Sequence, residues 1–139
     1  MAEASITHEF SVSADTLWEL IGDFGDMEKW AGPGAGSCTS DGEGLGALRT
    51  LTLPGGREVV DRLEAEGHRT YSYSIVRSTL PFVSYRATMA VEELGQGRCS
   101  LSWSGEFEPK GIGEAEAVAT AESMYRYGIR LMEQTLAQR

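Results

Sequence analysis

The chain has 139 residues, which is enough for one domain with a sizeable core and too few for two ordinary domains. Its 12 Lys and Arg residues against 21 Asp and Glu residues give a formal net charge of −9, so its long-range field repels nucleic acid and anionic membrane surfaces. The expected partner is therefore a small molecule that is neutral or only locally anionic, and neither nucleic acid nor membrane insertion is expected.

The N-terminal part of the chain predicts a strand followed by short helices. Apolar residues alternate with polar ones over residues 5–12, which is the period of a half-buried strand. Ser13 is a good N-cap, and apolar residues at helical spacing after it predict a helix over residues 14–23. A further helical turn over residues 27–30 places Trp30 at the margin of a loop, because the Pro and glycines that follow cannot propagate a helix.

The remaining chain predicts strands and then one long helix. The predicted strands cover residues 37–40, 45–53, 57–66, 70–77, 83–93 and 98–107. Short turns rich in Gly separate them, which favours antiparallel neighbours. From residue 113 to 138 apolar residues recur at helical spacing. This order predicts an α+β fold in which a curved antiparallel sheet is closed by a C-terminal helix.

Strand parity places two charged side chains on the inward faces of this sheet. Arg49 shares its face with leucines, and Asp61 shares its face with Val59 and Leu63. Because burying an unpaired charge costs several kcal/mol, we expect Arg49 and Asp61 to pair with each other, with tyrosines or through water. Two interpretations stay open: an internal ion pair that only completes the core, or a pair that orients a ligand in a partly wet pocket.

Segments spread over nearly the whole chain resemble one known family. They are Asp23-Phe24-Gly25 to Trp30, Gly46 to Arg49, Asp61-Arg62-Leu63, Tyr71 to Ile75, Leu80-Pro81 with Tyr85, and Trp103-Ser104-Gly105 with Phe107. Together they resemble the polyketide cyclase/dehydrase and lipid-transport branch of the START-like (SRPBCC, birch-pollen-allergen-like) helix-grip proteins. The resemblance implies a single START-like ligand-binding domain over residues 1–139. It also implies a seven-stranded antiparallel sheet around the long C-terminal helix, two short N-terminal helices and a deep cavity.

The same resemblance implies that loops rim the mouth of the cavity. The segments 53–56 and 78–82 stand where the gate and latch lie in plant abscisic-acid receptors, which are distant relatives. The latch pattern of those receptors is absent here, so a hormone-receptor role does not carry over. Whether the two loops act as a gate is left open.

The candidate ligand-binding residues are inward-facing strand positions together with residues of the loops and the C-terminal helix. They are Trp30, Leu51, Leu53, Val59, Tyr71, Tyr73, Ile75, Leu80, Ala87, Met89, Trp103, Phe107, Met124 and Gly128. Trp30 and Trp103 either stack on a planar ligand or simply fill the core. Gly128, inside the apolar stripe of the helix, either allows close packing or leaves room for a ligand.

The resemblance also implies a candidate catalytic set. Aromatic cyclases of this superfamily fold a poly-β-keto chain in the cavity and assist its enolisation and dehydration with Arg, Tyr and other polar groups. In this chain Asp61 would act as the base, Tyr85 or Tyr73 as the proton donor and Arg49 as the stabiliser of the enolate.

Other site chemistry finds little support in the sequence. Cys38 and Cys99 are isolated, without a CxxC motif or a nearby His at metal-ligand spacing, so reduced thiols are expected in place of a zinc site or a disulfide. His8 and His68 have no Ser or Cys partner in a nucleophile motif, and the Gly-rich stretches lack the Lys-Ser/Thr of a phosphate-binding loop. We therefore expect no metal and no cofactor.

The sequence thus leaves several functions open. The leading hypothesis is a protein that binds a hydrophobic or aromatic small molecule, with cofactor-free cyclisation or dehydration of a polyketide-like substrate as its enzymatic form. The alternative is a non-catalytic carrier or sensor of a lipid-like or hormone-like ligand, and a third is an interaction module with a vestigial cavity. The N-terminal sequence MAEASITHEF has no basic region before an apolar stretch, and no run of 18 apolar residues occurs. A cytoplasmic monomer or homodimer is expected.

Overall fold

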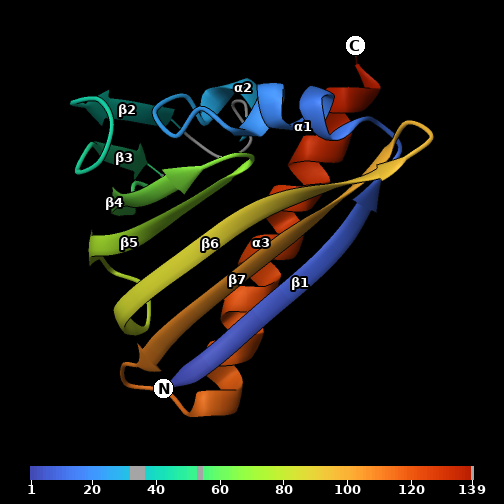
Figure 1. Cartoon of the computed structure of the whole chain (residues 1–139). Helices are drawn as coiled ribbons and strands as arrows, with labels where there is room; N and C mark the ends of the chain where they lie inside the picture. The colour runs from blue at the N-terminus through green and yellow to red at the C-terminus, as the bar shows by residue number, and fades with distance from the viewer. Residues whose placement is uncertain (32–36, 53–54, 139) are drawn as a thin grey trace.

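Seven strands in the described part of the chain form one antiparallel sheet, and a long helix packs against it (Figure 1). The computed structural model describes residues 1–31, 37–52 and 55–138. The strands are β1 (Ala2–Phe10), β2 (Ser37–Asp41), β3 (Leu48–Thr52), β4 (Glu58–Gly67), β5 (Thr70–Ser78), β6 (Phe82–Gly95) and β7 (Arg98–Pro109). The helices are α1 (Ala14–Ile21), α2 (Glu28–Ala31) and α3 (Glu114–Ala137). The predicted helix-grip α+β fold is confirmed.

The order of strands across the sheet is β1-β7-β6-β5-β4-β3-β2. The first strand of the chain therefore pairs with the last, and the long connection between β1 and β2 carries α1 and α2. These two short helices lie together beside the C-terminal end of α3 (Figure 1). The hydroxyl Oγ1 of Thr135 in α3 shares its one proton between the backbone carbonyl of Leu131 in the same helix, at 2.9 Å, and that of Trp30 in α2, at 3.1 Å. This contact joins α2 to the end of the long helix.

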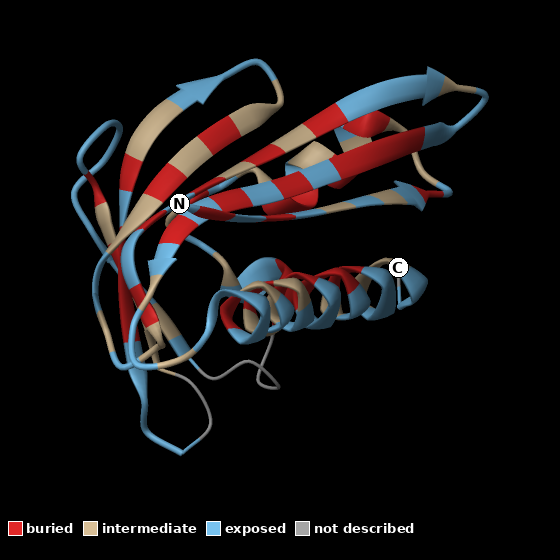
Figure 2. Cartoon of the chain, turned by 90° about the horizontal axis from the view of Figure 1, so that it is seen from below, coloured by how far each residue is buried: buried red, intermediate tan, exposed pale blue. Residues whose placement is uncertain are grey.

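Buried and exposed residues alternate along the strands, and the buried side of α3 is turned toward the sheet (Figure 2). The alternation is most regular on β6 and β7, where the inward residues from Tyr85 to Val91 and from Cys99 to Phe107 are almost all buried. The predicted parity of these two strands is confirmed. Their inner faces form the core on which α3 lies.

Most of the predicted boundaries differ from the observed ones by up to three residues. Strand β1 begins at Ala2 because residues 2–4 already pair with β7, and it ends at Phe10, two residues earlier than predicted. Helix α1 ends at Ile21, since the backbone N–H of Gly22 bonds to the carbonyl of Trp18 and closes the helix. Strand β3 begins only at Leu48, because Gly44 and Gly46 adopt positive φ angles before it.

Gly128 lies where α3 crosses the aromatic side chains of the interior. A Cβ atom at this position would lie 2.7 Å from Cζ3 and 2.9 Å from Cη2 of Trp103, and 3.5 Å from Cζ3 of Trp30. The missing side chain therefore lets the helix backbone approach the indole of Trp103. The geometry agrees with close packing at Gly128. The same close approach sets the distance between α3 and the sheet, and therefore also the room that is left for a ligand.

We predict that Gly128→Ala destabilises the fold. Alanine favours a helix by about 1 kcal/mol over glycine, but the overlap with Trp103 forces a shift of packed atoms that costs about 1–3 kcal/mol. Urea denaturation should show a net loss of stability. Gly67→Ala is the matched control, because its added carbon would lie at an ordinary 3.4 Å from Thr70 Cγ2. A Gly128→Ala protein more stable than the wild type would contradict this account.

Candidate functional site

A cavity of about 570 Å³ lies between α3 and the sheet. Its walls come from residue Met27, from α2, from β3 to β7 and from one side of α3. Most of the lining is apolar or aromatic, and the charged side chains among the described lining residues are Arg49, Arg57 and Asp61. The expected cavity is therefore present, with the predicted ion pair in its wall.

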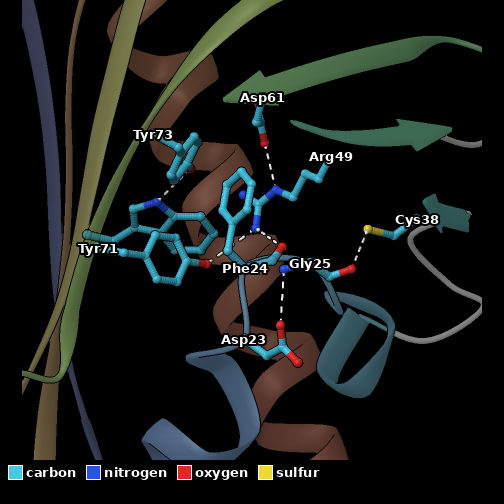
Figure 3. Close-up of polar contacts among 9 residues, drawn as sticks. Asp23, Phe24, Gly25, Cys38, Arg49, Asp61, Tyr71 and Tyr73 are labelled. Carbon is cyan, nitrogen blue, oxygen red and sulfur yellow. Dashed lines mark hydrogen bonds and ion pairs between the residues drawn. The ribbon is translucent and has the colours of Figure 1, made fainter. Parts of the chain in front are cut away.

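Arg49 and Asp61 face each other directly across two strands. The β3–β4 register pairs Arg49 with Asp61, and Nε of Arg49 donates to Oδ2 of Asp61 at 2.9 Å. Nη1 of Arg49 also donates to the backbone carbonyl of Phe24 at 3.2 Å and to Oη of Tyr71 at 3.3 Å (Figure 3). Both charged side chains are about 3% exposed. The predicted pairing of this buried Arg with the Asp and a tyrosine is confirmed.

Aromatic faces enclose the rest of the guanidinium. The Cζ atom of Arg49 lies 4.4 Å from the ring centroid of Phe24, 4.8 Å from that of Tyr73 and 5.9 Å from that of Tyr71. Such contacts let the negative faces of aromatic rings stabilise a cation that water cannot reach. Phe24 comes from the segment after α1, so the N-terminal helices help to hold the charge.

A change of strand register lies beside Asp61. Val60 pairs with Arg77, but Asp61 pairs with Ile75, so that Val76 of β5 is left as an extra residue. Such bulges bend a strand and re-aim the neighbouring side chain. Val59, Val60 and Asp61 are all buried here, whereas a regular strand would have turned Val60 outward.

Burial changes the proton affinity of the polar lining. It raises the pKa of the Asp61 carboxyl above its ordinary value, and the attraction of Arg49 acts in the opposite direction without cancelling it. Burial also raises the pKa values of the Tyr73 and Tyr85 hydroxyls well above the ordinary value, and that of Tyr125 to about 12. The cavity therefore presents neutral phenols at neutral pH.

The tyrosine hydroxyls form two separate contacts. The hydroxyl of Tyr85 on β6 shares a short hydrogen bond with that of Tyr125 on α3. Oη of Tyr73 accepts a hydrogen bond from Nε1 of Trp103 at 3.1 Å, which leaves its own proton for another acceptor. The ring of Trp103 stacks on that of Tyr125 with a centroid distance of 4.7 Å. No hydrogen bond joins Tyr85 to Arg49 or Asp61 among the described residues.

The structure brings most of the candidate residues to the cavity wall. Those that line it are Trp30, Arg49, Leu51, Val59, Asp61, Tyr73, Ile75, Leu80, Tyr85, Trp103, Met124 and Gly128. Leu53 lies outside the described residues. Whether any of them contacts a ligand stays a prediction.

Four candidate residues lie in the core, outside the lining of the cavity. Tyr71 sits behind Arg49 as one of its acceptors. Ala87 and Met89 are buried on β6, and Phe107 stacks on Tyr85 at a centroid distance of 5.7 Å. The inward side of a strand includes both core and cavity positions, so strand parity could not separate them.

Sequence reasoning missed several lining residues. These are Met27, Arg57, Thr120, Ser123, Tyr125, Tyr127 and Leu131. Tyr125 and Leu131 belong to the apolar stripe of α3, so the helical spacing already marked them as inward-facing. Thr120 and Ser123 are polar positions at the edge of that stripe, and no sequence pattern distinguished them from a solvated face.

The described residues contain neither a cluster of metal-ligating side chains nor a helix that could cross a membrane. Within residues 1–31, 37–52 and 55–138 no group of three or more His, Cys, Asp or Glu side chains is placed to hold a metal ion. None of the described helices has the length and apolar character needed to cross a bilayer.

Residues 1–137 match the family described as polyketide cyclase / dehydrase and lipid transport. Protein XoxI from Bacillus cereus is 29% identical, over 96% of this chain and 94% of its own, with a TM-score of 0.88. The Zhui aromatase/cyclase from Streptomyces sp. R1128 is 15% identical, over 96% of this chain and 89% of its own, with a TM-score of 0.72. Norcoclaurine synthase from Thalictrum flavum, in complex with dopamine and hydroxybenzaldehyde, is 20% identical, over 99% of this chain and 88% of its own, with a TM-score of 0.69. No curated protein matches in sequence.

We predict that Asp61→Asn lowers the free energy of unfolding by about 3–5 kcal/mol, because Arg49 then remains buried without its counter-charge. The paired substitution Arg49→Met with Asp61→Leu should recover at least half of that loss, since apolar side chains need no counter-charge. Chemical denaturation measures both values. Glu58→Gln, which breaks the exposed Arg77–Glu58 pair, is the control and should change stability by less than about 0.5 kcal/mol. An Asp61→Asn protein as stable as this control would refute the role of the pair.

Proposed function

Because the chain belongs to the polyketide cyclase/dehydrase and lipid transport family, we propose that it binds one hydrophobic or aromatic small molecule in the cavity under α3. The observation that carries this proposal is the cavity itself, whose volume of about 570 Å³ falls within the roughly 300–1,000 Å³ typical of small-molecule sites. In this proposal residues 1–139 act as one ligand-binding domain.

The composition of the walls supports an aromatic or alicyclic ligand. Indole and phenol rings from α2, β5, β6, β7 and α3 face the cavity, together with aliphatic side chains such as Leu51, Val59 and Ile75. Flat rings offer large apolar contact areas with few rotatable bonds, so they bind planar molecules at a small entropic cost. The polar groups are few and lie at fixed positions, which favours recognition of orientation over tight binding of charge.

A second candidate function is cofactor-free cyclisation or dehydration of a polyketide-like substrate. The observation that favours it is Asp61, a buried carboxylate of raised pKa in the wall of a cavity that also holds phenols. Asp61 would take a proton from the carbon between two carbonyls, and the enolate would attack a further carbonyl to form a carbon–carbon bond. Tyr85 or Tyr73 would protonate the resulting alkoxide, and Arg49 would stabilise the enolate charge.

Return of the first proton from Asp61 to the tyrosinate restores both groups. Asp61 then takes a neighbouring proton while the phenol protonates the departing hydroxyl, which leaves as water, and a second return of the proton completes the dehydration without an oxidant or reductant. Without turnover, the same cavity and polar groups would serve a carrier or sensor of a lipid-like or hormone-like ligand. The two functions share a binding site and differ only in whether Asp61 and the phenols act on the bound molecule.

We predict that filling the cavity abolishes binding while the fold persists. Ile75→Trp places an indole in the lining, whereas Val83→Trp adds the same group at an exposed strand position. Native mass spectrometry of each purified protein, with identification of any small molecule that co-purifies, measures occupancy, and thermal shifts with a panel of aromatic compounds measure binding. We expect the ligand and the shifts to be lost in Ile75→Trp and kept in Val83→Trp. Equal behaviour of the two variants would refute the cavity as the binding site.

We predict that Tyr85→Phe distinguishes an enzyme from a non-catalytic carrier. A synthetic tetra-β-ketone serves as the substrate, and mass spectrometry follows its loss of water. If Tyr85 is the proton donor, its substitution should lower the rate by about 10²–10⁴-fold and leave the affinity nearly unchanged. Ser72→Ala is the control, because it removes a part-buried hydroxyl that contacts Thr88 outside the cavity lining. No acceleration by the wild-type protein would reject the catalytic candidate and favour the carrier.

A further inference from the structure

The described lining of the cavity under α3 carries one more positive than negative charge. Arg49 and Asp61 form the buried ion pair, with 2.9 Å between Nε and Oδ2, so their charges offset each other. Arg57 is the third charged residue of the described lining, and it has no lining carboxylate of its own there. The whole chain carries a formal charge of −9. A general surplus of basic residues therefore does not account for Arg57 at this position.

The side chain of Arg57 has no partner within the described residues. Of residues 1–31, 37–52 and 55–138, none forms a hydrogen bond or an ion pair with it. The adjacent carboxylate of Glu58 is already paired with Arg77 of β5 at 3.3 Å. Arg57 and Val59 both line the cavity, whereas Glu58 between them does not, which is the alternation of an extended chain. The local backbone thus directs Arg57 to the cavity and Glu58 away from it.

Arg57 lies where the cavity opens to solvent. It is an exposed residue, as are Ser123 and Tyr127 on α3, although all three line the cavity. Asp61 and Tyr73, by contrast, are buried members of the same lining. A residue that lines a cavity and is also exposed marks its mouth, so a ligand that enters the cavity is able to reach the guanidinium of Arg57.

A cation at the mouth of an apolar cavity suits a ligand with an anionic end. A carboxylate deep inside would lose its hydration, whereas at the mouth it keeps water on one side and meets a guanidinium on the other. The planar guanidinium donates two parallel N–H bonds to a carboxylate. A charge at the opening of a cleft with low-dielectric walls also attracts counter-ions from solution. Because Arg57 is a single cation, it matches a monoanion better than a dianionic phosphate.

We propose that the ligand is an aromatic or alicyclic monocarboxylate, bound with its rings inside the cavity and its carboxylate on Arg57 at the mouth. The inference rests on the proposed binding function and adds to it the charge and the direction of the ligand. The aromatic and aliphatic walls bind the rings whatever the head group is. Arg57 is then the residue that selects an anion over neutral or cationic molecules with the same rings.

A matched set of compounds tests the selection on the wild-type protein. 2-Naphthylacetic acid, 2-naphthylacetamide and 2-(2-naphthyl)ethylamine carry one ring system with an anionic, a neutral and a cationic head. Calorimetric titration at neutral pH and low ionic strength gives the three dissociation constants. We expect the acid to bind about three- to tenfold more tightly than the amide, and the amine to bind least tightly, because an ion pair at an exposed position contributes modestly. Raising the ionic strength to about 1 M, where the Debye length is about 3 Å, should remove most of this preference.

Variants test whether Arg57 is responsible. Arg57→Gln should weaken binding of the acid by about three- to tenfold and leave the amide nearly unaffected. Arg126→Gln is the matched control, because it removes an equal charge from an exposed position on α3 outside the cavity lining. Ile75→Trp, which fills the cavity, should abolish binding of both compounds. Melting temperatures of the variants check that the fold is kept.

The outcomes separate this inference from the proposed function. Equal affinities of acid and amide in the wild type, or equal effects of Arg57→Gln and Arg126→Gln on the acid, would overturn the inference and leave the binding function standing. Acid binding that survives Ile75→Trp would show pairing on the surface and would also overturn it. If none of the three compounds binds to the wild type, the inference and the proposed function both fail for aromatic ligands of this size.

Discussion

A guanidinium buried inside a small domain requires hydrogen-bond acceptors and aromatic faces around it, because water cannot reach it. The partners of Arg49 account for much of the arrangement of this interior. Asp61 on β4 supplies the counter-charge, the backbone of Phe24 and the hydroxyl of Tyr71 accept from the same side chain, and Tyr73 covers its face. These partners come from two strands, β4 and β5, and from the segment after α1, so the charge is satisfied only when the sheet and the N-terminal helices are in place together.

The cavity follows from a second constraint, which is the distance between α3 and the sheet. Gly128 lets the helix approach Trp103 at one point, and Gly105 on β7 leaves the space that the hydroxyls of Tyr85 and Tyr125 occupy at another. Between these contacts the helix spans the curved sheet without filling the space beneath it. Closely packed interiors leave few voids larger than a water molecule, so a lined space of about 570 Å³ is far larger than an ordinary packing defect.

The sequence predicts the parts of this arrangement that depend on local rules. The alternation along β6 and β7 identifies the inward faces, and the energetic penalty of burying charge predicts that Arg49 and Asp61 pair with each other, with tyrosines or through water. It does not predict which inward residues line the cavity, because this depends on where α3 lies. Tyr85 and Tyr125 are far apart in the chain, and no spacing rule relates a strand to a helix that crosses it. The register shift at Val76 is also not predictable, because the local sequence does not differ from that of a regular strand.

Asp61 joins the stability of the fold to its proposed function. One of its oxygens satisfies Arg49 and the other, buried in the cavity wall, has no protein partner among the described residues. A ligand in the cavity would bind the folded state and not the unfolded chain, so its binding free energy would add to the stability of the domain. The Arg49–Asp61 pair in the cavity wall thus belongs both to the stability of the domain and to the surface that a bound molecule would stabilise.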